Sequence, residues 1–158
     1  MSSVQTSAGQ VIRPGPPYEA RCFCGAIHMM ASEEPLSVSY CHCADCRRAT
    51  GAPVVALAAF ATSSVTYVGT PKTAKGSKLG ATRTFCPDCG SSLAFYGDYV
   101  DGQTFIHLGL FDEFDYLVPT HHSYDGERPN WLNIDDQCAR FPGTARQALN
   151  AAAAAQGG

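Results

Sequence analysis

The chain has 158 residues, a formal net charge of -3 and a charged fraction of 16%. This length suits one domain around one hydrophobic core. The slightly acidic balance provides no broad basic surface, so we expect no nucleic-acid partner. No apolar run is long enough for a membrane helix, and the start, MSSVQTSAGQVIRPGPP, has neither a basic region nor an apolar stretch. We therefore expect a cytoplasmic protein with no membrane partner.

The two ends of the chain differ in composition from the part between them. Residues 1–17 are rich in Ser, Gly and Pro and offer too little apolar surface to offset the entropy of ordering. Residues 143–158 include five consecutive alanines, which favour a helix too short to be stable alone. The sequence predicts a flexible N-terminal arm over 1–17, one domain over 18–142, and an alanine-rich tail or frayed helix over 143–158.

The middle of the chain predicts an all-β domain. Short segments of β-branched and aromatic residues are interrupted about every ten positions by Gly, Pro, Asp or Ser, a pattern typical of sheets. No long segment has the apolar periodicity of a core helix. One helical turn is expected over 44–50, ended by Gly51 and Pro53. The predicted strands are 18–21, 26–31, 37–40, 54–60, 65–68, 82–85, 93–96 and 104–108.

Seven of the eight cysteines lie in three tight groups, CFC at 22–24, CHCADC at 41–46 and CPDC at 86–89. Disulfides between cysteines two or three positions apart would close strained rings, whereas zinc readily binds such near neighbours as chelating pairs. A secreted disulfide framework would also require a short chain with an export signal, and neither is seen here. The spacing therefore indicates metal binding.

The first and third groups predict a closed structural zinc site. Zinc–thiolate bonds of about 2.3 Å place tetrahedral sulfurs roughly 3.8 Å apart, so the ligands must come close together. CPDCG has the pattern of a zinc knuckle, in which the glycine can leave the turn at positive φ, and CFCG is a shorter pair of the same kind. The two pairs join the start of the domain to its middle. The predicted ligands are Cys22, Cys24, Cys86 and Cys89.

The second group, Cys41, Cys43 and Cys46, predicts a chemically open site. Structural zinc sites use four protein ligands, whereas catalytic sites commonly keep three and leave a position for water or substrate. Alternatively, His42 or another histidine supplies a fourth ligand and closes the site. The following pair, Arg47 and Arg48, either balances the thiolate charge and binds a substrate carboxylate or is only a solvated basic pair.

The remaining chemically interesting residues have simpler interpretations. His28, His107 and the pair at 121–122 fit surface or hydrogen-bonded core positions better than metal ligands. Cys138 has no cysteine near it and is expected to be a small buried apolar residue. Trp131 has apolar and aromatic neighbours, so we expect it to anchor packing.

Four sequences, CFCGAI, CHCADCRRATGAP, FCPDCGSSL and a late RPNWLNIDD, resemble in order and spacing the glutathione-dependent formaldehyde-activating enzyme family, which includes centromere protein V. The resemblance extends from Tyr18 to about Phe141. It implies a β-tent fold of twisted antiparallel sheets with few short helices and two zinc ions per chain. Its structural zinc ligands fall on the first and third cysteine groups, and its catalytic zinc ligands fall on the second.

The resemblance also implies an activity, that of a carbon–sulfur lyase. The substrate would be a glutathione-type thiol adduct such as S-(hydroxymethyl)glutathione, which the reverse reaction makes from formaldehyde and glutathione. In this hypothesis Arg47 or Arg48 holds a glutathione carboxylate. Two other classes of function stay open, a zinc-stabilised module that binds protein or chromatin and thiol redox chemistry at the second group. The candidate bases are His42, Asp45, His121 and His122.

Overall fold

The structure, a computed structural model, describes residues 15–76 and 80–156. Its strands are β1 (Tyr18–Arg21), β2 (His28–Ala31), β3 (Ser37–Cys41), β4 (Val55–Ala61), β5 (Val65–Val68), β6 (Lys72–Lys75), β7 (Thr82–Phe85), β8 (Ser92–Tyr96), β9 (Gln103–His107), β10 (His121–Ser123) and β11 (Ala139–Arg140). Its helices are α1 (Ala44–Thr50), α2 (Arg146–Gln156) and four short 3-10 turns, η1 (Thr62–Ser64), η2 (Asp98–Val100), η3 (Leu108–Leu110) and η4 (Asp125–Glu127).

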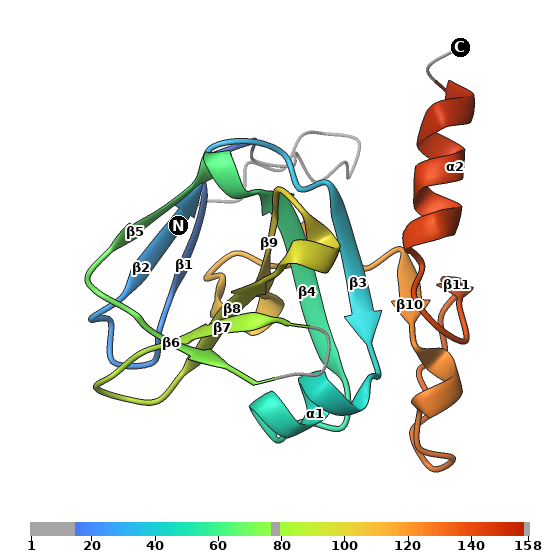
Figure 1. Cartoon of the computed structure of the whole chain (residues 1–158), viewed down its shortest axis with the longest axis horizontal. Coiled ribbons are helices and arrows are strands. Elements are labelled where there is room, and N and C mark those ends of the chain that lie inside the picture. Colours follow the sequence, from blue (N-terminus) through green and yellow to red (C-terminus); the bar gives the residue numbers. More distant parts are fainter. Residues whose placement is uncertain (1–14, 77–79, 157–158) are drawn as a thin grey trace, which may run out of the picture.

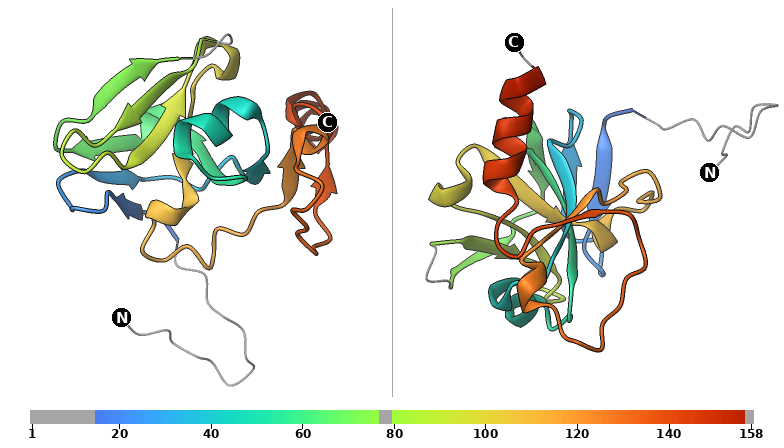
Figure 2. Two further views of the ribbon diagram at one scale, coloured as in Figure 1. Left: turned by 90° about the horizontal axis from the view of Figure 1, so that it is seen from below. Right: turned by 90° about the vertical axis from the view of Figure 1, so that its right-hand side faces the viewer.

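The strands form two sheets (Figure 1). The smaller sheet has the antiparallel order β1-β2-β5, and the larger has the order β11-β10-β3-β4-β9-β8-β7-β6. From β3 to β6 the neighbours in the larger sheet are antiparallel, whereas β10 runs parallel to both β3 and β11. The small sheet and the β10–β11 edge lie on opposite sides of the molecule, and α2 extends beyond the sheets (Figure 2, right).

The main hydrophobic core lies between the two sheets. Phe60 of β4 and Ile106 of β9 are fully buried and pack in one cluster with Tyr18 and Met29 of the small sheet. The Phe60 ring centroid lies 5.8 Å from that of Tyr18 and 6.0 Å from that of Phe111. Because successive side chains of a strand point to opposite faces, alternate residues such as Ala58 and Phe60 of β4 enter this core. In β8 the consecutive residues Leu93 and Ala94 both enter it, where the register with β7 shifts.

The alternate residues of the same strands form a second apolar cluster on the other face of the large sheet. It contains Leu57 of β4 and Phe95 of β8, together with Cys41 and Cys46. The register pairs Phe95 with Phe105 of β9, and their rings stack with centroids 4.8 Å apart. The large sheet is therefore apolar on both faces, and the second face carries cysteines.

The predicted all-β class with few short helices is confirmed. All eight predicted strands form, with ends displaced by no more than two residues, and α1 occupies the predicted 44–50 segment with Gly51 as its C-cap. Three strands were not predicted: β6, whose four residues are all exposed, and the short strands β10 and β11. Their pattern lacks the apolar alternation that identifies a half-buried strand.

The ends of the chain can be compared with the sequence only in part. Of the predicted N-terminal arm, residues 1–14 lie outside the described residues. The segment predicted as a tail or frayed helix contains α2 over Arg146–Gln156. None of the helices that the structure describes is both long and apolar enough to cross a membrane.

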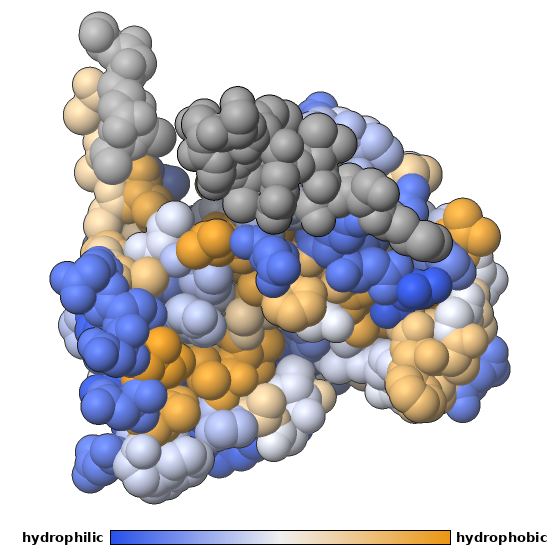
Figure 3. All heavy atoms as spheres, turned by 180° about the vertical axis from the view of Figure 1, so that it is seen from behind, coloured by the Kyte–Doolittle hydropathy of each residue, from blue (hydrophilic) through white to orange (hydrophobic). Residues whose placement is uncertain are grey.

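Two packing predictions were wrong. Trp131 is 73% exposed and anchors no core, because the segment around it forms turns on the surface. Cys138 is only partly buried, and its thiol donates to the carbonyl of Pro119. Exposed apolar residues of this kind are scattered over the surface, and seen from behind they lie in separate groups between hydrophilic residues (Figure 3).

The contrast between Phe60 and Trp131 gives a stability prediction. Phe60→Ala should lower the free energy of unfolding by about 3 to 5 kcal/mol, because it removes a fully buried ring and leaves a cavity. Trp131→Ala should change it by less than about 0.5 kcal/mol. Urea denaturation of both variants measures this, and a larger loss for Trp131→Ala would contradict the placement of the core.

Candidate functional site

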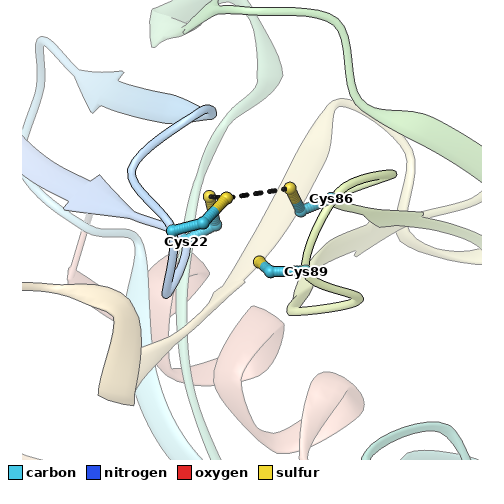
Figure 4. Close-up of side chains that lie close together, drawn as sticks. Cys22, Cys86 and Cys89 are labelled. Atoms are coloured by element: carbon cyan, nitrogen blue, oxygen red, sulfur yellow. Dashed lines mark hydrogen bonds between the residues drawn. The ribbon is translucent and has the colours of Figure 1, made fainter.

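Two loops bring Cys22, Cys24, Cys86 and Cys89 together (Figure 4). The first pair follows β1 and the second follows β7. The Cys24 sulfur lies 3.6 Å from that of Cys22 and 3.8 Å from that of Cys86, and all four sulfurs lie within 4.8 Å of one another. These separations fit the roughly 3.8 Å between sulfurs around a tetrahedral metal. The cluster therefore fits one metal ion and connects the small sheet to the large one.

Glycines shape both loops. Gly25 and Gly90 have φ values of +77° and +75°, a region that residues with a Cβ rarely adopt. The Gly25 amide donates to the Cys22 carbonyl and the Gly90 amide to the Cys86 carbonyl, which closes each turn. The glycine after each cysteine pair was predicted to allow this turn, and the backbone confirms it.

Hydrogen bonds favour the thiolate form of two members of this cluster, Cys22 and Cys89. The amide of Ile27 donates to the Cys22 sulfur at 3.3 Å, and the Ser91 hydroxyl lies 3.2 Å from the Cys89 sulfur. The bond from Ser91 is the main cause that lowers the pKa of Cys89 to about 5. Thiolate is the form of cysteine that binds a metal, so the surroundings suit the donor set.

The second cluster lies where β3 meets α1. Cys41 is the last residue of β3, Cys43 is the N-cap of α1, and Cys46 lies within α1. The Cys43 sulfur accepts a hydrogen bond from the Cys46 amide at 3.3 Å, so the thiol itself caps the helix. Within the described residues, no fourth metal-binding side chain joins these three sulfurs in one group.

The three thiols hold negative charge. Hydrogen bonds from the Cys41 and Cys46 thiols lower the pKa of Cys43 to about 2. The same contact raises the pKa of Cys41, because its thiol donates its proton to the Cys43 thiolate. One guanidinium nitrogen of Arg83, from β7, lies 3.9 Å from the Cys46 sulfur. An anionic cluster of this kind is suited to a cation such as a metal ion.

A cavity of about 530 Å³ opens onto this second cluster. Its wall is the cysteine-bearing face of the large sheet, where β3, β4, β7, β8, β9 and β10 each contribute side chains. Beyond the three cysteines, the lining includes Arg83, Phe95, Tyr99, Phe105, His121 and Tyr124. The four-cysteine cluster does not line this cavity, so the two clusters have different surroundings.

Of the four predicted acid–base candidates, two line the cavity and two do not. Asp45 and His121 line the cavity. His42 and His122 do not; the His42 Nε2 lies 2.9 Å from the His122 Nδ1, and the His122 Nε2 lies 2.9 Å from an Asp136 carboxylate oxygen. His42 is therefore engaged beside the cavity wall and does not join the three cysteines as a fourth ligand.

The two predicted substrate-binding arginines do not line the cavity. The Arg47 side chain donates to the carbonyl of His42 at 3.2 Å, and Arg48 is exposed. Their role in substrate binding stays a prediction. Two other arginines, Arg83 and Arg146, line the cavity and were both missed. Arg83 is the lone charged residue of a short strand, TRTF.

Tyr124 was also missed, and its sequence context gives no signal. It has φ +57°, the one residue other than glycine in the described part of the chain at positive φ. Its amide donates to the Gly143 carbonyl at 2.7 Å, which holds this backbone against the segment before α2. Burial and then the nearby Cys43 raise the pKa of Tyr124, so its hydroxyl keeps its proton at neutral pH.

An all-β domain with one four-thiol cluster and one three-thiol cluster at a cavity defines a candidate metalloprotein. The family model for glutathione-dependent formaldehyde-activating enzyme matches residues 17–127, and the chain belongs to this family.

Two individual proteins are also similar to the chain. An uncharacterized lyase of Schizosaccharomyces pombe is 36% identical over 128 residues, which cover 80% of this chain and 91% of that protein. A crystal structure of a Rhodobacter sphaeroides protein matches with a TM-score of 0.51 and 20% identity, covering 60% of this chain and 88% of that one. This second match shows a similar fold.

Replacement of one cysteine in the four-thiol cluster should unfold the domain. We expect Cys86→Ser to lose bound metal and the cooperative thermal transition, because closed thiolate sites contribute on the order of 10 kcal/mol of apparent free energy. Cys138→Ser is the matched control, since its side chain can still donate to Pro119. Metal analysis and thermal melting measure both effects, and a cooperative melt of Cys86→Ser at the wild-type temperature would contradict the assignment.

The burial of His107 predicts that acid lowers the free energy of unfolding. Burial, followed by the charge of Arg83, lowers its pKa to about 4, from about 6.5 in an unfolded chain. The unfolded state thus binds more protons, and the contribution of neutral His107 is fully present above pH ~6.5 and lost as pH falls toward ~4.

Between pH 7.5 and 4.5, the free energy of unfolding should fall by about 2 to 3 kcal/mol more in the wild type than in His107→Gln. Effects of acid on the metal sites are common to both proteins and cancel in the difference. If the free energy of unfolding depends on pH in the same way in both proteins, His107 does not titrate as described.

Proposed function

We propose that the protein is a zinc-dependent carbon–sulfur lyase acting on a glutathione-type thiol adduct such as S-(hydroxymethyl)glutathione, and that the reverse reaction joins formaldehyde to glutathione. The observation that carries the proposal is the position of three thiols, without a fourth protein ligand among the described residues, at the wall of a cavity of about 530 Å³. Family membership and the lyase name of the yeast relative support it.

In this proposal each chain holds two zinc ions. The sulfurs of the four-cysteine cluster fit a closed structural site away from the cavity. Cys41, Cys43 and Cys46 would hold the second ion, which favours the thiolate form of a substrate sulfur when bound. Three protein ligands are the number typical of catalytic zinc.

Side chains around the cavity would accept the hydroxyl proton of the adduct. In the lyase direction the carbon–sulfur bond breaks and its electron pair stays on sulfur, while the hydroxyl proton leaves and the carbonyl double bond forms. Asp45 and His121 face the cavity and are the candidate bases. Tyr99 and Tyr124 also face it. Burial raises the pKa of both, to about 12 for Tyr99, so their hydroxyls serve as hydrogen-bond donors.

We further propose that the protein acts in the cytoplasm. All eight cysteines are free thiols in the structure. Free thiols suit a reducing compartment, in which disulfides are rare and glutathione is kept reduced.

The reaction itself gives the direct test. Zinc-loaded protein should accelerate the exchange between formaldehyde, glutathione and their adduct, followed by magnetization-exchange NMR. Cys43→Ser should lower the rate by about 100-fold or more, because the metal's charge stabilisation is worth several kcal/mol and each ~1.4 kcal/mol corresponds to tenfold.

Cys138→Ser should keep the wild-type rate, since Cys138 lies outside the cavity lining. A wild-type rate no faster than the uncatalysed reaction would refute the proposed activity. A Cys43→Ser protein that remains folded and fully active would refute the role of the second cluster.

A further inference from the structure

One part of the cavity wall is lined by apolar side chains. Phe95 of β8 and Phe105 of β9 are neighbours in the sheet register, and their rings stack with an interplanar angle of 4°. Leu57 of β4 belongs to the same cluster and is 2% exposed. These side chains share one cluster with Cys41 and Cys46, so the apolar surface begins directly beside the thiols.

The guanidinium of Arg83 lies over the Phe95 ring at this wall. It lies opposite Phe95 in the register, with its guanidinium carbon 5.0 Å from the centroid of the Phe95 ring. Its Nη2 lies 3.9 Å from the Cys46 sulfur, whereas its Nη1 is buried and has no hydrogen-bond partner among the described residues. A buried charged donor without an acceptor is costly, so an acceptor oxygen that reached this nitrogen would be stabilised.

The adduct of formaldehyde does not account for these two features. Formaldehyde contributes a single carbon, which is too small to cover two stacked rings. Glutathione carries charged groups along its length, and such groups gain nothing from an apolar wall. Apolar surface facing a cavity is stabilised when an apolar group displaces the water on it. The wall beside the thiols therefore fits the other half of a larger adduct, the half that comes from the aldehyde.

We propose that Phe95, Phe105 and Leu57 bind an apolar, preferably aromatic, substituent on the aldehyde-derived carbon, and that Arg83 donates to the hydroxyl oxygen on that carbon. This inference rests on the proposed function. The hydroxyl-bearing carbon joins the sulfur to the substituent, and Arg83 likewise lies between the Cys46 sulfur and the Phe95 ring.

The chemistry needs no further reactant. As the hydroxyl proton leaves, negative charge develops on the oxygen and the Arg83 guanidinium offsets it. The carbon–sulfur bond then breaks with its electron pair on sulfur, and the products are the apolar aldehyde and the thiol. Arg83 is thus a catalytic residue in this proposal, and the two phenylalanines determine specificity.

A pair of unreactive thioethers tests the apolar subsite. Isothermal calorimetry should show that the zinc-loaded protein binds S-benzylglutathione about 10-fold or more tightly than S-methylglutathione, because burying a phenyl group gains at least that factor. Phe105→Ala should abolish the preference, and Phe105→Leu, which keeps most of the apolar volume, should reduce it. Phe114→Ala is the matched control, since Phe114 is half-exposed and outside the cavity lining.

Equal affinity for the two thioethers, or an unchanged preference in a folded Phe105 variant, would overturn the subsite. If the protein prefers S-benzylglutathione but accelerates the formation or breakdown of no adduct, the subsite stands and the lyase activity is refuted. If it accelerates the reaction of the formaldehyde adduct but does not prefer S-benzylglutathione, the lyase activity stands and the subsite is refuted.

Kinetics with the adduct of glutathione and benzaldehyde test Arg83. Arg83→Gln should lower kcat by about 100-fold or more, as expected for loss of a donor to a developing oxyanion. Its affinity for S-benzylglutathione, which lacks the hydroxyl, should stay within about 3-fold of wild type at equal zinc content, and Arg83→Lys should recover part of kcat. Parallel losses of kcat, zinc and thioether affinity in Arg83→Gln would overturn the catalytic role.

Discussion

The alternation of side chains across the large sheet is the constraint on which the rest of the structure depends. Val38, Phe60 and Ile106 enter the core against the small sheet, while residues one position away, such as Ser39 and Phe105, face the cavity. A shift of one residue in the register would exchange these two sets and put cavity residues into the core. The register that buries the core therefore also places Cys41 at the cavity.

The two thiol clusters differ in their surroundings. The four-cysteine cluster joins loops from the two sheets, so it resists their separation. The three-cysteine cluster lies at the other side of the large sheet, where α1 begins, and its sulfurs face a cavity with polar and aromatic walls. A cluster that is only structural has no need of such a cavity. This difference in surroundings, more than the number of sulfurs, supports a chemical role for the second cluster.

The end of the chain contributes to the cavity beyond the part that the family model matches. The match ends at residue 127, whereas Thr144, Ala145, Arg146 and Leu149 line the cavity from the start of α2. The segment is held in place by the bond between the Tyr124 amide and the Gly143 carbonyl. Cavity residues on this side of the molecule therefore lie outside the segment that the family model matches.

The sequence was sufficient for features that depend on local patterns. Short segments of β-branched and aromatic residues identified eight strands, and the spacing of cysteines identified both clusters. The sequence was insufficient where the pairing of distant segments decides which residues reach the cavity. Arg83 and Tyr124 meet the cysteines only because β7 and the residues after β10 come to the same cavity, and no local pattern encodes this. Trp131 was wrongly predicted to be buried, because apolar neighbours in sequence do not ensure burial.

Zinc K-edge X-ray absorption of the fully loaded protein tests the central claim, an open thiolate site beside a closed one. Without substrate, the average number of sulfur ligands per zinc should lie between three and four, and saturation with glutathione should raise it to four. Four protein ligands at every zinc before glutathione is added, with no change afterwards, would contradict it.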